Sequence, residues 1–203
     1  MRTALRVVGV VYLASWIVGL LIWPVNLATN ATGGTVISAF TGHTALASTQ
    51  YLLTEGLAGL TLGIVLIALA RALPSRPTLI VGGLAALVSL VETGIGLYLA
   101  TVLVPARDAD AAHTWFALLN VLDGVKMLLL AITAIVASIG SHAVPRWLVH
   151  AGFALAVAMI VSGIGYVFDL PGIALAAAVS LPLLLIWITG TAFTLRPVAA
   201  PRG

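Results

Sequence analysis

The sequence contains no cysteine and very few charged residues. Of its 203 residues only 7% are charged, nine Lys and Arg against six Asp and Glu, whereas a soluble domain carries about 25%. Without cysteine the chain forms no disulfide, no cysteine-ligated zinc site and no thiol active site. Because 62% of the residues are hydrophobic, an intrinsically disordered chain is excluded as well. The net charge of +3 comes from only a few charged groups. Their positions are informative about membrane topology, and we expect no nucleic-acid partner.

Motifs for nucleotide, redox or metal chemistry are also missing from the sequence. No P-loop, dinucleotide-binding fingerprint or nucleophile elbow occurs. The histidines, which are His43, His113, His142 and His150, show no metal-ligand spacing. We therefore expect no metal and no cofactor.

Long apolar runs dominate what the chain does contain, and its mean hydropathy is +1.20. A membrane-spanning helix needs about 20 mostly apolar residues. Suitable segments cover residues 4–23, 50–70, 78–104, 112–137, 147–168 and 173–195. They predict an all-α fold in which residues 1–203 form a single transmembrane domain, a bundle of six helices. Proline stands at most of the breaks, and Pro182 is expected to kink the last helix.

The arginines predict the orientation of this bundle. If the six helices alternate in direction, one side of the membrane holds Arg2, Arg6, Arg71, Arg76, Arg146, Arg196 and Arg202. The other side holds only Arg107, next to Asp108 and Asp110. The positive-inside rule then places both termini in the cytoplasm. Together with the alanine-rich, lysine-poor composition, this predicts a multi-pass protein of a bacterial inner (plasma) membrane.

The segment between Pro24 and Gln50 is much longer than the other connections. Loops of this length are often lids or mobile segments. Its portion from Val36 to Ala47 is apolar enough to lie on the membrane surface or to dip into the mouth of a cavity. An unstructured external loop is the alternative interpretation, and the sequence alone does not decide between the two.

An internal repeat relates the second and third predicted helices to the fourth and fifth. Residues 53–56 (Leu-Thr-Glu-Gly) align with 121–124 (Val-Leu-Asp-Gly), and 94–96 with 163–165, both Gly-Ile-Gly. This pattern predicts a duplicated helical hairpin, and membrane folds often place a site between such repeats. It also predicts that Glu55 and Asp123 lie at similar depth and face one central cavity.

Four ionisable residues fall at membrane depth, where charge is costly and often functional. Asp123 and Lys126 are three residues apart on one helix, so we expect them to pair, with Asn120 donating a hydrogen bond to the carboxylate. Glu55 and Glu92 have no local cation, and burial is expected to favour their neutral acid forms. Each group also has a purely structural interpretation, as an internal ion pair or as an acid hydrogen-bonded between helices.

Aromatic residues complete the predicted site. Trp23, Trp115, Trp147 and Phe168 are expected in the aromatic belts at the membrane surfaces. Around the candidate catalytic residues Glu55, Glu92 and Asp123, we expect a substrate cavity lined by Tyr12, Trp16, Tyr51, Asn120, Lys126 and Tyr166.

Two groups of proteins resemble this chain. The residues 145–148 (Pro-Arg-Trp-Leu) and the Leu-rich last helix, ending in Gly190 and Arg196-Pro197, resemble uncharacterised bacterial six-helix membrane proteins, which implies no function. Size, helical membrane architecture and buried carboxyl groups on separate helices resemble the small integral-membrane terpene cyclases of meroterpenoid and indole-terpenoid pathways. That second resemblance implies protonation of an alkene or epoxide on a prenyl chain, followed by carbocation cyclisation without a metal.

The sequence is therefore compatible with three alternative functions. The first is a membrane terpene cyclase that takes a lipophilic substrate from the bilayer. The second is a proton-coupled carrier, which would need to dimerise because six helices are few, and a homo-oligomer is left open. The third is an accessory subunit, in which the glycines 56, 59, 63, 94 and 96 serve close helix packing.

Overall fold

The computed structural model describes residues 2–23, 27–139 and 143–195, and no strand occurs in these ranges. The predicted all-α class is confirmed. The helices are α1 (Arg2–Ile22), α2 (Gly33–Phe40), α3 (Thr44–Tyr51), α4 (Ala58–Ala72), α5 (Arg76–Tyr98), α6 (Val104–Ala106), α7 (Ala109–Ser138), α8 (Arg146–Val167), α9 (Pro171–Ala174) and α10 (Ala177–Thr194). Two π-helical segments, Leu52–Leu57 and Leu99–Leu103, join α3 to α4 and α5 to α6.

Six helical stretches are long and apolar enough to cross a membrane, as the sequence predicts. They are Arg2–Ile22, Thr44–Ala72, Arg76–Ala106, Ala109–Ser138, Arg146–Val167 and Pro171–Thr194. Each overlaps one predicted span, and the second and third are extended by α3 and α6. The protein is therefore a multi-pass membrane protein.

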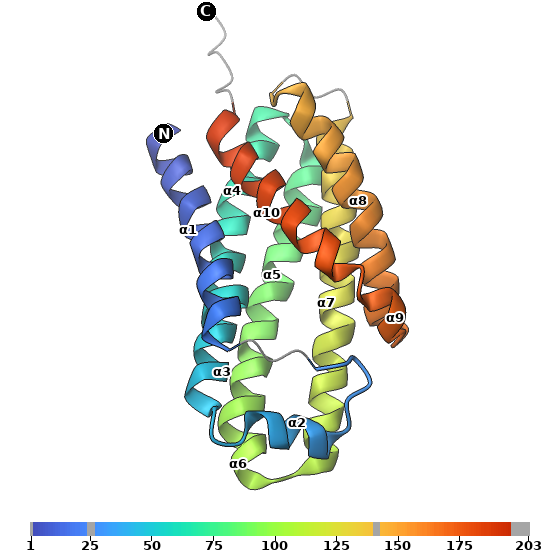
Figure 1. The fold of residues 1–203 in the computed structure, drawn as a ribbon. Coiled ribbons are helices and arrows are strands. Elements are labelled where there is room, and N and C mark those ends of the chain that lie inside the picture. The colour runs from blue at the N-terminus through green and yellow to red at the C-terminus, as the bar shows by residue number, and fades with distance from the viewer. Residues whose placement is uncertain (1, 24–26, 140–142, 196–203) are drawn as a thin grey trace, which may run out of the picture.

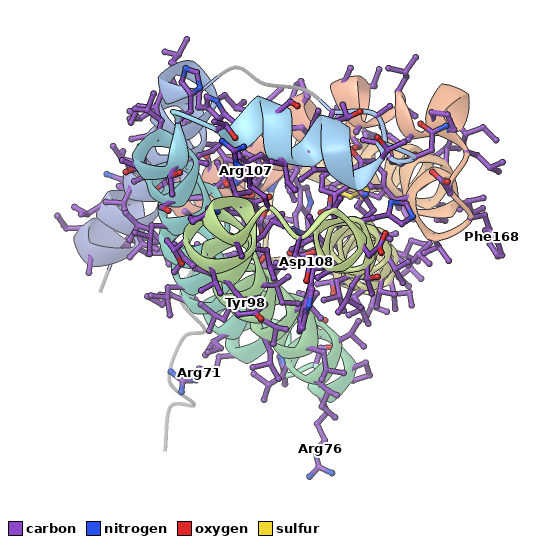
Figure 2. All side chains as sticks on the ribbon, turned by 90° about the horizontal axis from the view of Figure 1, so that it is seen from below. Arg71, Arg76, Tyr98, Arg107, Asp108 and Phe168 are labelled. Carbon is purple, nitrogen blue, oxygen red and sulfur yellow. The ribbon has the colours of Figure 1, made fainter. Side chains whose placement is uncertain are left out.

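The ends of the bundle differ in charge. The start of α1 and the end of α10 lie at one end, together with the link between α4 and α5 (Figure 1), which Arg71 of α4 and Arg76 of α5 flank. Arg107 and Asp108 lie at the opposite end, where α6 meets α7 beside α2 (Figure 2). Arg196 and Arg202, which also entered the topology prediction, lie outside the described residues. The cytoplasmic location of the termini remains a prediction, and we call the end with α2 and α6 the outer end.

The long connection between the first two spans contains a helix, α2. Its helix α2 begins after Thr32, whose Oγ1 accepts a hydrogen bond from the Thr35 backbone N–H. The helix lies across the outer end of the bundle (Figure 1), and Val36 and Phe40 are fully buried there. The unstructured alternative is wrong for this part of the chain, because the apolar face of α2 packs onto the ends of the spanning helices.

The sixth span is interrupted before Pro182, and the kink expected at this proline stays a prediction. The helical hydrogen-bonding pattern breaks at residues 175–176, between α9 and α10, whereas α10 continues through Pro182. Gly165 permits α9 to turn back closely onto α8, because a Cβ atom there would lie 2.4 Å from the backbone nitrogen of Ala174.

Two apolar cores fill the bundle, with a polar layer between them. The core toward the termini includes Leu62, Leu66, Leu130 and Leu148. The core at the outer end includes Phe40, Leu99, Leu103 and Phe116. On α5, Ala85 belongs to the inner core and Ile95 belongs to the outer core. Glu92 lies between these two residues.

Candidate functional site

Lys126 stands at the centre of a buried cluster of charges. Its Nζ atom lies 2.7 Å from Glu55 Oε2, 2.6 Å from Glu92 Oε2 and 2.8 Å from Asp123 Oδ1. Glu55 comes from the π-helical segment before α4, Glu92 from α5, and Asp123 and Lys126 from α7. The Lys126 side chain is only 7% exposed. One ammonium group therefore holds three carboxyl groups together in the polar layer between the two cores.

The geometry confirms one predicted contact and adds two that the sequence did not predict. Asp123 and Lys126 pair as their spacing on one helix predicts. Glu55 and Glu92, which have no cation near them in the sequence, both contact Lys126 in the structure. The reason is tertiary: α5 packs against both α7 and the α3–α4 span, which places both acids around a lysine that is distant in sequence.

The backbone at Glu55 departs from regular α-helix. Glu55 and Thr54 are the buried residues of the π-helical segment Leu52–Leu57. Such segments insert one residue into an α-helix and are frequent at functional sites. Because one extra residue rotates the side chains that follow it, regular helical periodicity does not predict the direction of Glu55.

A small cavity of about 190 Å³ lies on the outer side of the cluster. The three carboxyl residues Glu55, Glu92 and Asp123 line it, with the amides of Gln50 and Asn120. The prediction that Glu55 and Asp123 face one cavity is therefore confirmed, whereas the duplication itself remains a prediction. Most of the remaining wall is aromatic: Trp23, Phe40, Tyr51, Phe116 and Tyr166. We call this space the acidic cavity.

A larger cavity of about 800 Å³ adjoins the same cluster. Residues of α1, α9 and α10 line it, and α7 contributes Asp123, Lys126 and Met127 to the lining. Apolar residues such as Leu20, Leu175 and Leu184 predominate in the lining. We call it the lateral crevice, because α1 and the α9–α10 span diverge toward the outer end along this face of the bundle (Figure 1).

The two cavities share part of their walls. The residues common to both are Trp23, Leu27, Gln50, Asp123 and Tyr166. A molecule lying in the apolar crevice would therefore reach the carboxyl groups past Asp123. Such a combination suits a ligand with a long apolar part and one compact polar or reactive end.

The structure distributes the predicted lining residues unevenly. Tyr51 and Asn120 line the acidic cavity, Trp16 and Lys126 line the lateral crevice, and Tyr166 lines both. Tyr12, by contrast, is 1% exposed and lies in the inner core, outside both linings.

Asn120 does not make its expected bond to Asp123. Its Nδ2 donates instead to the backbone oxygens of Thr29, at 3.1 Å, and Phe116, at 3.0 Å. The amide therefore holds the outer connection onto α7.

Sequence reasoning missed Trp23, Gln50 and Phe40 as site residues. Trp23 was expected in an interfacial belt, but it is 5% exposed and borders both cavities. Its ring meets Phe40 edge to face at 4.6 Å, and Gln50 Nε2 donates to its backbone oxygen at 3.1 Å. For Phe40 the sequence offered one signal, the apolar stretch of the long connection, which was expected to lie on the membrane surface or to dip into the mouth of a cavity.

Three buried polar atoms of the site have no hydrogen-bond partner within the described part of the chain. They are Oε1 of Glu92 and the indole nitrogens of Trp16 and Trp23. Glu92 as a whole is 2% exposed. Buried polar groups are nearly always satisfied, so each such atom calls for an explanation, and a ligand is one.

The three acids also meet the spacing of a metal site, since oxygens of Glu55, Glu92 and Asp123 lie within 4.8 Å of one another. However, the Lys126 ammonium is at hydrogen-bonding distance from all three. It occupies the position between them that a cation would take, so this lysine is the resident counter-ion of the cluster.

Comparison with family models, with curated proteins and with solved structures finds no match for this chain. Its function therefore has to be inferred from the cluster and the two cavities.

Proposed function

We propose that this protein is an integral-membrane terpene cyclase, which protonates a prenyl chain with a buried carboxylic acid and guides the cyclisation of the resulting carbocation. The observation that carries the proposal is the junction of the two cavities. Three carboxyl groups line a small aromatic cavity, and this cavity adjoins an apolar crevice between α1, α9 and α10. A prenyl chain partitions into lipid, and a lateral crevice gives it a route to the acids.

The charge balance of the cluster supports an available proton. Three carboxylates around one ammonium would leave two negative charges uncompensated in a site largely shielded from water. Burying uncompensated charge is expensive, and a carboxyl group at such a position takes up a proton instead. In this proposal the cluster holds at least one carboxylic acid, and an acid kept neutral by its surroundings is a competent proton donor.

We assign the donor role to Glu92. It is the most buried of the three acids, with a side chain 3% exposed, and its Oε1 is free of protein partners in the described ranges. Transfer of its proton to an alkene carbon forms a C–H bond and a tertiary carbocation. With an epoxide, the same proton opens a C–O bond and leaves a hydroxyl group.

Asp123 is assigned as the final base. Its side chain is 28% exposed, more than those of Glu55 and Glu92, and it borders both cavities. After ring closure the cation loses a proton from a neighbouring carbon, which forms an alkene and protonates a carboxylate of the cluster. The net reaction is an isomerisation, and one proton transfer within the cluster restores Glu92.

The aromatic walls suit the cationic intermediate. Faces of electron-rich rings stabilise nearby positive charge, and Trp23, Tyr51 and Tyr166 line the acidic cavity. The buried ring of Phe40, the last residue of α2, limits the access of water from the outer end. Exclusion of water protects a carbocation from premature capture.

The other two functions have less support. A carrier needs a path to both membrane surfaces, but the buried core of Leu62, Leu66, Leu69 and Leu148 lies on the inner side of the cluster. An accessory role needs only tight packing, and two cavities around a charged cluster are not required for it.

The proposal is tested with purified protein in lipid nanodiscs and prenylated aromatic compounds, with and without a terminal epoxide. Wild-type protein should convert one of them to an isomer of equal mass, with deuterium incorporated from heavy water in the alkene case. Glu92→Gln should lower the rate by about 100-fold or more, and Asp123→Asn and Glu55→Gln should also lower it.

Asp110→Asn is the matched control, because it removes one carboxylate from an exposed position at the outer end of α7. Absence of any isomer with wild-type protein, or full activity in all three cluster variants, would reject the proposal.

A further inference from the structure

The acidic cavity combines surplus negative charge with aromatic walls. Its acids outnumber the single ammonium of Lys126 that contacts them. Five aromatic residues share its lining, and Glu92 contributes a buried oxygen without a partner in the described ranges. Carboxylates and aromatic faces together are the chemistry by which proteins recognise organic ammonium ions.

We propose that the acidic cavity binds the head of a cationic amphiphile, an alkylammonium ion whose chain lies in the lateral crevice. Glu92 and Asp123 serve as counter-ions, and the rings of Trp23 and Tyr166 contact the ammonium methyl or methylene groups. The inference uses the same cavities as the proposed function, but it requires no turnover and does not depend on cyclisation.

A small inorganic cation fits this cavity less well than an organic one. Metal ions prefer several oxygen ligands at close range, and the shared point between the three acids already holds Lys126 Nζ. What remains is a space of about 190 Å³ bounded by rings and amides. A weakly hydrated ammonium with an attached chain can fill that space and reach the crevice through the shared wall.

The ammonium ion and the extra proton of the cluster compensate the same negative charge. Binding of one therefore disfavours the other, so the ligand should release protons and bind more tightly as the pH rises. The titratable groups that neighbouring helices place near the cluster are Tyr12 of α1, Tyr51 of α3 and Tyr166 of α8. Tyrosine hydroxyls are neutral at physiological pH, so the proton that the ligand displaces comes from a carboxyl group.

The experiment uses protein in nanodiscs of phosphatidylglycerol, which supplies no ammonium headgroup. Decyltrimethylammonium is titrated calorimetrically in two buffers of different ionisation heat, and decanol and decyl sulfate serve as neutral and anionic probes of equal chain length. We expect saturable binding of the ammonium with proton release, and binding of each other probe at least about tenfold weaker. Glu92→Gln and Asp123→Asn should each weaken ammonium binding at least about tenfold, whereas Asp110→Asn should not.

Thermal unfolding of each variant separates loss of binding from loss of fold. If Glu92→Gln does not fold, Trp23→Leu, which removes a ring and no charge, supplies the second test and should weaken binding at least about threefold. Competition by added phosphatidylethanolamine would identify a lipid headgroup as the natural source of the ammonium, and its absence would point to a free amine.

Equal binding of decanol and the ammonium ion would overturn the inference, as would unchanged affinity in both Glu92→Gln and Asp123→Asn. Failure of the isomerisation assay leaves this measurement unaffected, because binding is read without turnover. The two proposals can therefore fail separately.

Discussion

The ammonium nitrogen of Lys126 lies 2.6 Å from Oε2 of Glu92, and this ion pair joins α7 to α5 in the middle of the bundle. Both side chains are nearly inaccessible, at 7% and 3% exposed. The same nitrogen binds two further carboxyl groups, so one lysine determines the charge of the whole site. Removing it affects both the fold and any chemistry of the acids.

Replacement of Lys126 by Met should therefore destabilise the protein strongly. The variant leaves three buried acids without their cation, and breaking a buried pair in this way costs about 3–5 kcal/mol. The measurement is equilibrium unfolding in mild detergent. Lys126→Met combined with Glu92→Gln should be less damaging than the two single effects added, because the second change removes one of the acids that lost its cation. Arg71→Gln, at an exposed position, is the control. A loss no larger than that of the control would contradict the central role of this lysine.

Gly96 of α5 should be intolerant of a side chain, since its partner is a ring that lines the acidic cavity. A Cβ atom at Gly96 would lie 2.4 Å from Cγ of Tyr51. Gly96→Ala should destabilise by about 1–3 kcal/mol through overpacking and should displace Tyr51. Gly94→Ala is the matched control on the same helix, because nothing lies within 4 Å of its Cβ position.

Unfolding measurements on both glycine variants, with ligand or substrate binding as a second readout, check this prediction. Gly94→Ala should leave both properties near wild type. Equal behaviour of the two variants would show that Tyr51 yields without cost.

The amide of Asn120 should hold the outer connection closed over the acidic cavity. It donates to the backbone oxygen of Thr29, and the Thr29 hydroxyl donates in turn to Asp169 Oδ1 at 2.6 Å. Asn120→Ala should cost about 0.5–1.5 kcal/mol for the lost bond and speed hydrogen exchange at residues 27–32. The control is Thr114→Ala, which removes a hydroxyl bonded only within its own helix. Unchanged exchange in Asn120→Ala would mean that burial of α2 alone secures this segment.

Gly165 should control the shape of the lateral crevice. A Cβ atom at this position would lie 2.4 Å from the nitrogen and 2.7 Å from the Cα atom of Ala174 in α9. Because backbone atoms cannot move aside like a side chain, Gly165→Ala should push α9 away from α8 and weaken binding of long-chain ligands. Gly83→Ala on α5, which lies outside both cavity linings and has nothing within 4 Å of its Cβ position, should bind them as the wild type does. The comparison fails if both variants bind with wild-type affinity.

The sequence predicted the individual helices well because their signals are local. Runs of about 20 apolar residues are enough to identify spans, and the spacing of Asp123 and Lys126 was enough to pair them. It failed where a local signal was absent or ambiguous. Leu175 and Ala176 at the α9–α10 break carry no helix-breaking signal, so the sequence did not predict that interruption.

For the site, the sequence identified the four buried charges but not their arrangement. Charged residues are rare inside apolar runs, so the sequence alone identified four unusual residues, Glu55, Glu92, Asp123 and Lys126. That they meet at one nitrogen could not be read from the chain, because it depends on how three helices are rotated against each other. The π-helical segment around Glu55 alters that rotation and has no recognised sequence pattern here.

Composition and hydrophobic runs alone determined that this is an all-helical membrane protein with six spans, because lipid admits few other ways to satisfy the backbone. Only the tertiary structure decided that one lysine holds all three acids and that an aromatic cavity and an apolar crevice meet beside them. The physical reason is that burial of a single helix depends on its own residues, whereas the environment of a buried charge depends on every helix packed around it.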